Sequence, residues 1–207
     1  MQIIVLANEQ QKAELLAKSK NEKVSIEFVD DYSQFSQKTA DALFILRDEI
    51  DISKLRSFIV QPVFIHSVVF TLHDLDLPGN VSRINAWPTF LQREIWEVAA
   101  KDVDQVKNIF QALGWKYLLV PDEPGFVAAR VIAMIINEAY FAFDDDVSSK
   151  DQIDVAMRLG TNYPYGPFEW AKKIGLNNIY TLLKRLSEVS KRYTVAPAME
   201  NELADTN

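Results

Sequence analysis

Few side chains of this 207-residue chain could carry acid-base chemistry near neutral pH. His66 and His73 are its two histidines, and histidine is the side chain whose ordinary pKa lies nearest neutrality. Nothing in their spacing requires either one to act as a general base, so that role stays an open alternative. Two histidines and no cysteine also argue against a metal site, and the lack of cysteine excludes disulfides and thiolate chemistry.

The first apolar run, residues 3–6, leads into a turn of sequence ANEQ at positions 7–10. A turn between a strand and a helix holds phosphates when it is rich in glycine, because the backbone must turn tightly and approach the phosphates closely. The first glycine of this chain is Gly79, and Glu9 would compete with phosphates for the positive end of the helix dipole. The sequence therefore argues against ordinary dinucleotide binding at this turn.

Asp30 or Asp31 ends a second strand-like run, residues 24–29. In nucleotide-binding sheets an acid at the end of the second strand holds the ribose of adenosine. Without a glycine turn before it, a solvated strand-end acid is the preferred interpretation of Asp30. Ribose binding is the alternative.

The charge balance argues against nucleic acid as a partner. The chain has 22 basic and 29 acidic residues, a net charge of −7, and no cluster of Lys and Arg to meet a phosphate backbone. No apolar stretch approaches the roughly 20 residues that a membrane span needs. The N-terminus lacks the pattern of a signal peptide, so we expect a cytoplasmic protein.

Two kinds of pattern divide the chain. In the first part, short apolar runs typical of buried strands alternate with polar segments that can form helices, which predicts a parallel sheet. The runs are residues 3–6, 24–29, 42–46, 63–65 and 118–120, and residues 9–18 have helical composition. From Asp122 the apolar period becomes helical. We therefore expect an α/β domain over residues 1–120 and an all-helical domain over residues 121–207.

The helical part opens with a long amphipathic segment. Apolar residues recur at spacings of three and four over residues 127–143, which predicts one helix with a broad apolar face. Ser149 followed by Gln152 has the form of a capping box for a helix over residues 150–159. Gly160 is expected to end that helix.

Two further helices are expected. Pro167 fits the first turn of one helix, and Gly175 fits its end. Asn177 is expected to cap a last helix over residues 178–192. The tail, residues 196–207, is polar and is expected to fray.

The segment from Asp122 to Leu176 resembles the helical C-terminal domain of the 3-hydroxyacyl-CoA dehydrogenase family. The resemblance rests on the blocks DEPGF at 122–126, DQIDVAMRLG at 151–160, YPYGPFEWA at 163–171 and GL at 175–176. It implies a helical domain like the C-terminal domain of 6-phosphogluconate dehydrogenase. It also implies a homodimer formed through these helices.

Upstream, the blocks ADALFI at 40–45 and RINAWPTFLQREIWEVA at 83–99 also resemble this family. They imply a Rossmann-like NAD domain before the helices. The family carries a long insert, with a helical arm that contacts CoA, between the counterparts of Asp30 and Ala40. That insert is essentially absent from this sequence, so a shortened Rossmann-like domain is expected.

The resemblance also locates the family's catalytic positions. Glu97 matches the catalytic glutamate, and the position twelve residues before it, where the family has its histidine, is Asn85. Asparagine cannot exchange a proton near neutral pH, so acid-base catalysis at Asn85 is not expected. Ala129 stands where the family has a helix asparagine, and a substrate-contacting serine falls near Ser67. Together with the missing glycine turn, these changes predict a degenerate redox site.

Three hypotheses remain open. The first is a catalytically degenerate relative in fatty-acid metabolism, without a cofactor, acting as a dimeric scaffold or a module that binds an acyl-CoA-type molecule. The second is an active NAD-dependent 3-hydroxyacyl-CoA dehydrogenase with unconventional site residues. The third is a structural partner that completes the active site of another enzyme.

Overall fold

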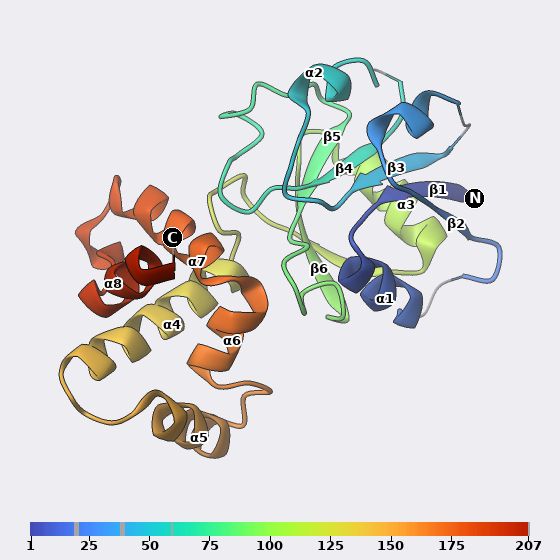
Figure 1. Cartoon of the computed structure of the whole chain (residues 1–207). Helices are drawn as coiled ribbons and strands as arrows, with labels where there is room; N and C mark the ends of the chain where they lie inside the picture. Colours follow the sequence, from blue (N-terminus) through green and yellow to red (C-terminus); the bar gives the residue numbers. More distant parts are fainter. Residues whose placement is uncertain (19–20, 38–39, 59, 207) are drawn as a thin grey trace. The chain divides into compact units, whose positions relative to one another are not determined.

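The computed structural model describes residues 1–18, 21–37, 40–58 and 60–206 (Figure 1). It divides into two units, Met1–Phe126 and Val127–Asn207, each continuous in sequence. Residues 121–126, which the sequence analysis assigned to the helical domain, lie in the first unit. The Asp122 carboxylate accepts hydrogen bonds from the N–H of Leu72 and His73, which anchors this segment to the loop after a strand.

The described residues of the first unit form a seven-stranded sheet of order β2-β1-β3-β4-β5-β6-β7. The strands are β1 (Gln2–Leu6), β2 (Ser25–Val29), β3 (Ala42–Ile45), β4 (Val63–His66), β5 (Val81–Ile84), β6 (Ile95–Ala100) and β7 (Lys116–Leu119). Strands β1 to β5 are parallel, β6 runs antiparallel to β5, and β7 is parallel to β6. The predicted α/β fold with a Rossmann-like sheet is confirmed, with one antiparallel strand added.

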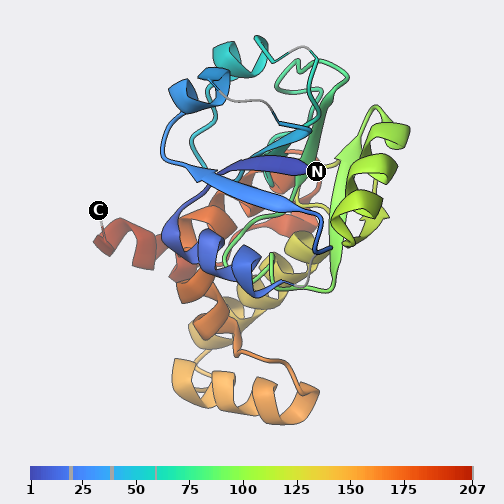
Figure 2. The same ribbon diagram turned by 90° about the vertical axis from the view of Figure 1, so that its right-hand side faces the viewer.

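Each face of the sheet has its own core. On one face, helices α1 (Glu9–Ala17) and α3 (Val103–Leu113) cover an aromatic core that includes Phe44, Phe64 and Trp96. On the other face, the 3₁₀ turn η1 (Tyr32–Gln37) and the short helix α2 (Ile52–Leu55) contribute Phe35 and Leu55. Figure 2 shows α1 below the strands, with η1 and α2 above them.

The chain order of the strands creates a switch point. After β1 the chain continues to β2 on one side, then crosses back to β3 on the other side of β1. This crossover, residues 30–41, holds a 3₁₀ turn and no α-helix in its described part. Ligands of open α/β sheets bind where the strand order reverses, outside the carboxyl ends of the strands. The region to search for a site is therefore the carboxyl end of β1 and β3.

The second unit is all-helical, as predicted. Its elements are α4 (Ala128–Asp144), α5 (Lys150–Thr161), α6 (Pro167–Ile174), α7 (Leu176–Ser187), the 3₁₀ turn η2 (Lys191–Tyr193) and α8 (Pro197–Thr206). Ser149 caps α5 by accepting the N–H of Gln152, as predicted. Gly160 does not end α5, because the helix continues to Thr161 and Asn162 supplies the left-handed cap with φ of 56°.

Two sequence expectations in the last third are wrong. Asn177 does not cap a helix, because α7 begins at Leu176 directly after Gly175 and ends at Ser187. The tail does not fray, because α8 buries Met199 completely. The chain before α8 is held by Asn137 of α4, whose amide donates to Thr194 O at 2.8 Å and accepts the N–H of Ala196 at 2.9 Å.

The α5–α6 junction explains the spacing of the blocks that carry the family resemblance. The buried carboxylate of Asp154 accepts the N–H groups of Phe168 at 2.8 Å and Glu169 at 3.0 Å, so it caps α6 from another helix. Gly166 lies directly against Asp154, where a Cβ atom would have no room. Among the described residues, no helix is long and apolar enough to cross a bilayer.

Candidate functional site

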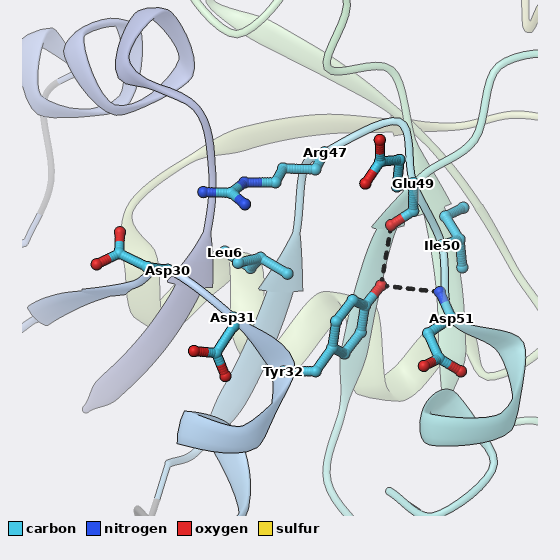
Figure 3. Close-up of a pocket in the computed structure, with 8 residues that line it drawn as sticks. All are labelled: Leu6, Asp30, Asp31, Tyr32, Arg47, Glu49, Ile50 and Asp51. Carbon is cyan, nitrogen blue, oxygen red and sulfur yellow. Dashed lines mark hydrogen bonds between the residues drawn. The ribbon is translucent and has the colours of Figure 1, made fainter.

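A cavity of about 410 Å³ opens at the carboxyl ends of β1, β2 and β3, beside the switch point (Figure 3). Its lining residues are Leu6, Asp30, Asp31, Tyr32, Arg47, Glu49, Ile50 and Asp51. Four of these side chains are acidic and one is basic. The excess of negative charge on this lining repels phosphate groups, which are also negatively charged.

Tyr32 forms one wall of this cavity. Its hydroxyl donates to Glu49 O at 3.2 Å and accepts the N–H of Asp51 at 3.1 Å (Figure 3). Burial raises the pKa of the Tyr32 phenol above its ordinary value. A hydroxyl that already donates to the backbone and resists ionisation is a structural group here, because its proton is not offered to a ligand.

Asp30 lies where the sequence placed it, directly after β2. Its carboxylate is 78% exposed and 3.5 Å from the ammonium of Lys12 on α1. The Asp30 N–H donates to Gln34 Oε1 at 3.0 Å. Asp30 is therefore a solvated acid paired with a lysine, and a role in binding a ribose stays a prediction.

The turn between β1 and α1 is closed by its own side chains. Asn8 caps α1, with its Oδ1 accepting the N–H of Gln11 at 2.9 Å while Gln11 Oε1 accepts the N–H of Asn8 at 3.0 Å. Arg47 reaches across from β3 and places Nη2 3.4 Å from Ala7 O. The two capping bonds use the N–H groups of Asn8 and Gln11, which would otherwise face a phosphate, so the residues at this turn do not fit a pyrophosphate.

The Gln11 side chain also links helix α1 to two segments at the edge of the sheet. Its amide Nε2 donates to Leu46 O at 2.5 Å and to Ala86 O at 3.2 Å, and the side chain is 4% exposed. The amide thus connects α1 with the carboxyl ends of β3 and β5. Sequence reasoning missed this residue, although Asn8 followed three positions later by Gln11 is the signature of a capping box.

We predict that Gln11→Leu destabilises the first unit by about 1–3 kcal/mol, because two buried carbonyls lose their donor. Urea unfolding followed by tryptophan fluorescence measures this, since Trp87, Trp96 and Trp115 lie in the first unit. Gln10→Leu is the matched control, because the exposed Gln10 bonds only to a neighbouring side chain of its own helix. Equal stability of the two variants would contradict the bridging role of Gln11.

His66 ends β4 and has both ring nitrogens engaged. Nδ1 accepts the N–H of Ala86 at 3.0 Å, and Nε2 lies 3.1 Å from Asp48 Oδ1. The ring is 4% exposed and is held between two other segments of the sheet edge. His73 lies in a different loop and is exposed, so the structure does not bring the two histidines to one site.

The hydrogen bond from His66 lowers the pKa of the Asp48 carboxyl below its ordinary value of 3.8. A lowered carboxyl pKa stabilises the fold above pH 3.8, and the stabilisation is lost as the pH falls through the folded-state pKa. We expect Asp48→Asn to cost less than about 1 kcal/mol at pH 7, since Asp48 is 71% exposed and screened by solvent. Urea midpoints at pH 7 and pH 3 test this. A difference from wild type that is the same at both pH values would contradict the assignment.

Asn85 directly follows β5, and Glu97 lies in the neighbouring strand β6. Ile84 of β5 pairs with Val98 of β6, so the same antiparallel register sets Glu97 opposite Asn85. Asn85 is 7% exposed, and its Oδ1 accepts the N–H of Trp87 at 3.1 Å. The structure thus brings together the two positions that the family resemblance singled out.

The other two candidate positions, Ser67 and Ala129, are engaged in contacts that support the fold. Ser67 follows β4 and donates its hydroxyl to Phe70 O at 2.7 Å. Ala129 is fully buried in the first turn of α4, in the second unit. Among the described residues, no three His, Cys, Asp or Glu side chains are grouped so that they could hold a metal ion.

Arg83 is a buried charge that the sequence analysis did not single out. It is 0% exposed on β5 and donates to Phe70 O at 2.8 Å and to Glu123 O at 3.0 Å. Its guanidinium lies 3.1 Å from Asp122 Oδ1 and 4.6 Å from the centre of the Phe126 ring. Burial lowers the Arg83 pKa to about 10, so the side chain stays charged at neutral pH.

A second cavity, of about 490 Å³, lies on the helical unit. It is lined by Arg130, Val131, Met134, Ile135 and Glu138 of α4 together with Arg192 and Tyr193. Val131 is 51% exposed, and Val127, one turn before it, is 54% exposed. This part of α4 therefore presents apolar side chains to solvent with arginines beside them.

Comparisons with known proteins agree with this architecture. Residues 125–207 match the model of the 3-hydroxyacyl-CoA dehydrogenase C-terminal domain. One relative is 3-hydroxyadipyl-CoA dehydrogenase from Escherichia coli (strain K12), which is 47% identical over 76 residues. The aligned segment covers 37% of this chain and 16% of that protein. Another is 3-hydroxybutyryl-CoA dehydrogenase from Clostridioides difficile, which is 38% identical over 82 residues. That segment covers 39% of this chain and 29% of the relative. The chain thus matches less than a third of the length of either relative.

Solved structures extend the likeness of fold to both units. The structure of FadB2 from M. tuberculosis aligns with 99% of this chain and 93% of its own, with a TM-score of 0.75 and 13% identity. That of (S)-3-hydroxybutyryl-CoA dehydrogenase PaaH1 from Ralstonia eutropha aligns with 87% of this chain and 70% of its own, with a TM-score of 0.70 and 20% identity. At these identities the likeness concerns the fold.

Proposed function

We infer that this chain, a member of the 3-hydroxyacyl-CoA dehydrogenase family by its C-terminal domain, acts in fatty-acid metabolism as a binding module or scaffold for acyl-CoA-type molecules and no longer as a dehydrogenase. The observation that carries this proposal is the self-capped turn between β1 and α1. There Asn8 and Gln11 satisfy each other's backbone N–H groups. A dinucleotide would have to displace that box to place its phosphates on the helix.

The charge of the neighbouring cavity supports the same proposal. Asp30, Asp31, Glu49 and Asp51 face a single arginine, Arg47, at the place where a dinucleotide lies on sheets of this topology. Asp30 is already paired with Lys12. A phosphate-bearing ligand gains little electrostatic attraction there, so we propose that neither NAD nor the phosphates of CoA bind in this cavity.

The site chemistry also supports loss of the redox reaction. Oxidation of an alcohol moves a hydride from the carbon that bears the hydroxyl, and it needs a group that accepts the hydroxyl proton, which an amide at Asn85 cannot do. His66 cannot take over without giving up its hydrogen bonds to Ala86 and Asp48. A binding role requires neither of these proton transfers.

The acyl-CoA class is proposed from the relatives. Those reported above are named for 3-hydroxyadipyl-CoA and 3-hydroxybutyryl-CoA, both thioesters of coenzyme A. We further propose a homodimer formed through the helical unit, because the exposed Val131 of α4 and Val127 just before this helix would be covered by a second copy. A cytoplasmic location belongs to the same proposal.

A second candidate function is an active NAD-dependent 3-hydroxyacyl-CoA dehydrogenase with unconventional residues. The likeness of fold to PaaH1 of Ralstonia eutropha, whose name states this activity on a butyryl thioester, favours it. A third candidate, a structural partner that completes another enzyme's site, shares the fold evidence of the first. A direct binding measurement separates these candidates.

Isothermal titration of the whole chain with NADH, acetoacetyl-CoA and free CoA tests the proposal. We expect heat of binding with the thioester and none with NADH. Binding of NADH together with its oxidation when acetoacetyl-CoA is added would overturn the proposal in favour of the dehydrogenase. Binding of none of the three compounds would leave only a structural role.

A further inference from the structure

The cavity of about 490 Å³ on the helical unit has no role in the ligand binding discussed so far. Its volume lies in the range of small-molecule sites, which is roughly 300–1,000 Å³. All the residues that line it belong to Val127–Asn207. The side chains of this one unit therefore determine what the cavity can hold.

The floor of the cavity is an apolar strip on α4. Val131, Met134 and Ile135 stand at positions i, i+3 and i+4, which share one face of a helix. Val131 is 51% exposed, and the other two side chains are half-buried. Removing such apolar surface from water is favourable, and the flexible methionine adapts to the shape of what covers it. The strip therefore suits an unbranched apolar chain.

The charged side chains of the cavity favour an anion. Arg130 and Arg192 line it together with one carboxylate, that of Glu138. Arg192 is exposed, and the central carbon of its guanidinium lies 5.3 Å from the centre of the Tyr193 ring. A guanidinium presents a planar fork of N–H donors that matches a carboxylate. The balance of charge is thus opposite to that of the acidic cavity beside β1.

We propose that this cavity binds an amphiphile with an unbranched apolar chain and one anionic head group, which is the chemistry of a medium-chain fatty carboxylate. The chain covers the apolar floor on α4, and the carboxylate pairs with Arg192. A cationic ligand is repelled by the two arginines, and an uncharged ligand gains nothing from them. Neither NAD nor a short-chain thioester is involved, so this proposal holds or fails separately from the proposed function.

Two other occupants share part of this chemistry. A long-chain thioester of CoA has the same apolar chain, but its negative charge is on phosphates. A second copy of this chain would cover Val131, as proposed above, and would compete with the amphiphile for the floor. Decanoyl-CoA and the oligomeric state are therefore part of the test.

Isothermal titration of the whole chain with hexanoate, octanoate and decanoate tests the proposal. We expect each added methylene to tighten binding about fourfold, the effect of burying one CH₂ group. Octan-1-ol and octylammonium have the chain of octanoate without its negative charge, and we expect them to bind about tenfold more weakly. Tighter binding of decanoate than of decanoyl-CoA assigns the cavity to the free acid. The reverse order assigns it to the thioester, and both results support an anionic amphiphile.

Two pairs of variants locate the binding. Arg192→Glu should weaken octanoate binding about tenfold, whereas Lys191→Glu makes the same change of charge at an exposed neighbour and should have little effect. Val131→Asp puts a carboxylate on the floor and should also weaken binding. Val155→Asp is its control, because Val155 is 44% exposed on α5. Neither control residue is among the described residues that line the cavity.

Urea midpoints within error of wild type show that the variants fold. Octanoate affinity that Arg192→Glu leaves unchanged, or equal affinity for octanoate and octan-1-ol, would overturn the proposal. Sedimentation of wild type and Val131→Asp gives the oligomeric state. A wild-type dimer that binds no amphiphile, together with a monomeric Val131→Asp, would show that a second copy occupies the floor and would also overturn the proposal.

Discussion

Gly166→Ala is expected to destabilise the helical unit by about 2–4 kcal/mol. A Cβ at this position would lie 2.3 Å from Asp154 Oδ1 and 2.4 Å from Asp154 Cβ. Asp154 cannot swing away, because its buried carboxylate holds the N–H groups of Phe168 and Glu169 at the start of α6. Either the backbone moves or α6 loses its cap, and both outcomes cost stability.

Thermal unfolding followed by circular dichroism measures the effect, and the chain supplies a matched control. Gly160 lies inside α5, and a Cβ there would meet nothing within 4 Å. Gly160→Ala should therefore stabilise the protein by roughly 0.5–1 kcal/mol, since alanine is the better helix former. The double variant Gly166→Ala, Asp154→Gly should lose less stability than the sum of the losses of its two single changes, because the clash needs the Asp154 side chain, its Cβ included. Additive effects would show that the clash is not the cause.

Arg83→Met is expected to destabilise the first unit by about 3–5 kcal/mol. Methionine matches part of the volume but removes the guanidinium hydrogen bonds to Phe70 O and Glu123 O, and it leaves Asp122 without its counter-charge. The stacking of the guanidinium on Phe126 is lost as well. Urea unfolding at pH 7 measures the change, because Arg83 is still charged there.

Arg56→Met is the matched control for Arg83. Arg56 makes an ion pair with Asp76 that is 2.9 Å long, but the two side chains are 53% and 92% exposed. Such a surface pair contributes less than about 1 kcal/mol. Similar losses in the two variants would mean that burial does not set the cost of removing these arginines.

Hydrophobic pattern alone located five strands and the longest helix to within two residues. Runs such as 3–6 and 42–46 lie in the middle of the sheet, where both faces are covered and the apolar signal is continuous. Strand β5 gave no such signal, because its four residues include Ser82 and Arg83, both fully buried. A strand that buries polar side chains cannot be recognised from apolar runs.

The sequence predicts candidate site positions through the family resemblance, but it does not predict the contacts of those residues. The resemblance placed Asn85 and Glu97 on one site, and the antiparallel register of β5 and β6 sets them opposite each other. The roles of Gln11 and Asn137 were not predictable, because each binds backbone groups at least 35 residues away in sequence. Which carbonyl meets a buried amide is decided by the completed fold.

The division of the chain into two continuous units has a consequence for how the protein is made. Residues 1–126 contain all seven strands, so the sheet depends on no residue that is translated after Phe126. A ribosome adding 5–20 residues per second needs on the order of ten seconds for the remaining roughly 80 residues. The parallel strands, which are slow to pair, thus gain that interval while the helical unit is still being made, and α4 is the first helix of that unit to be translated.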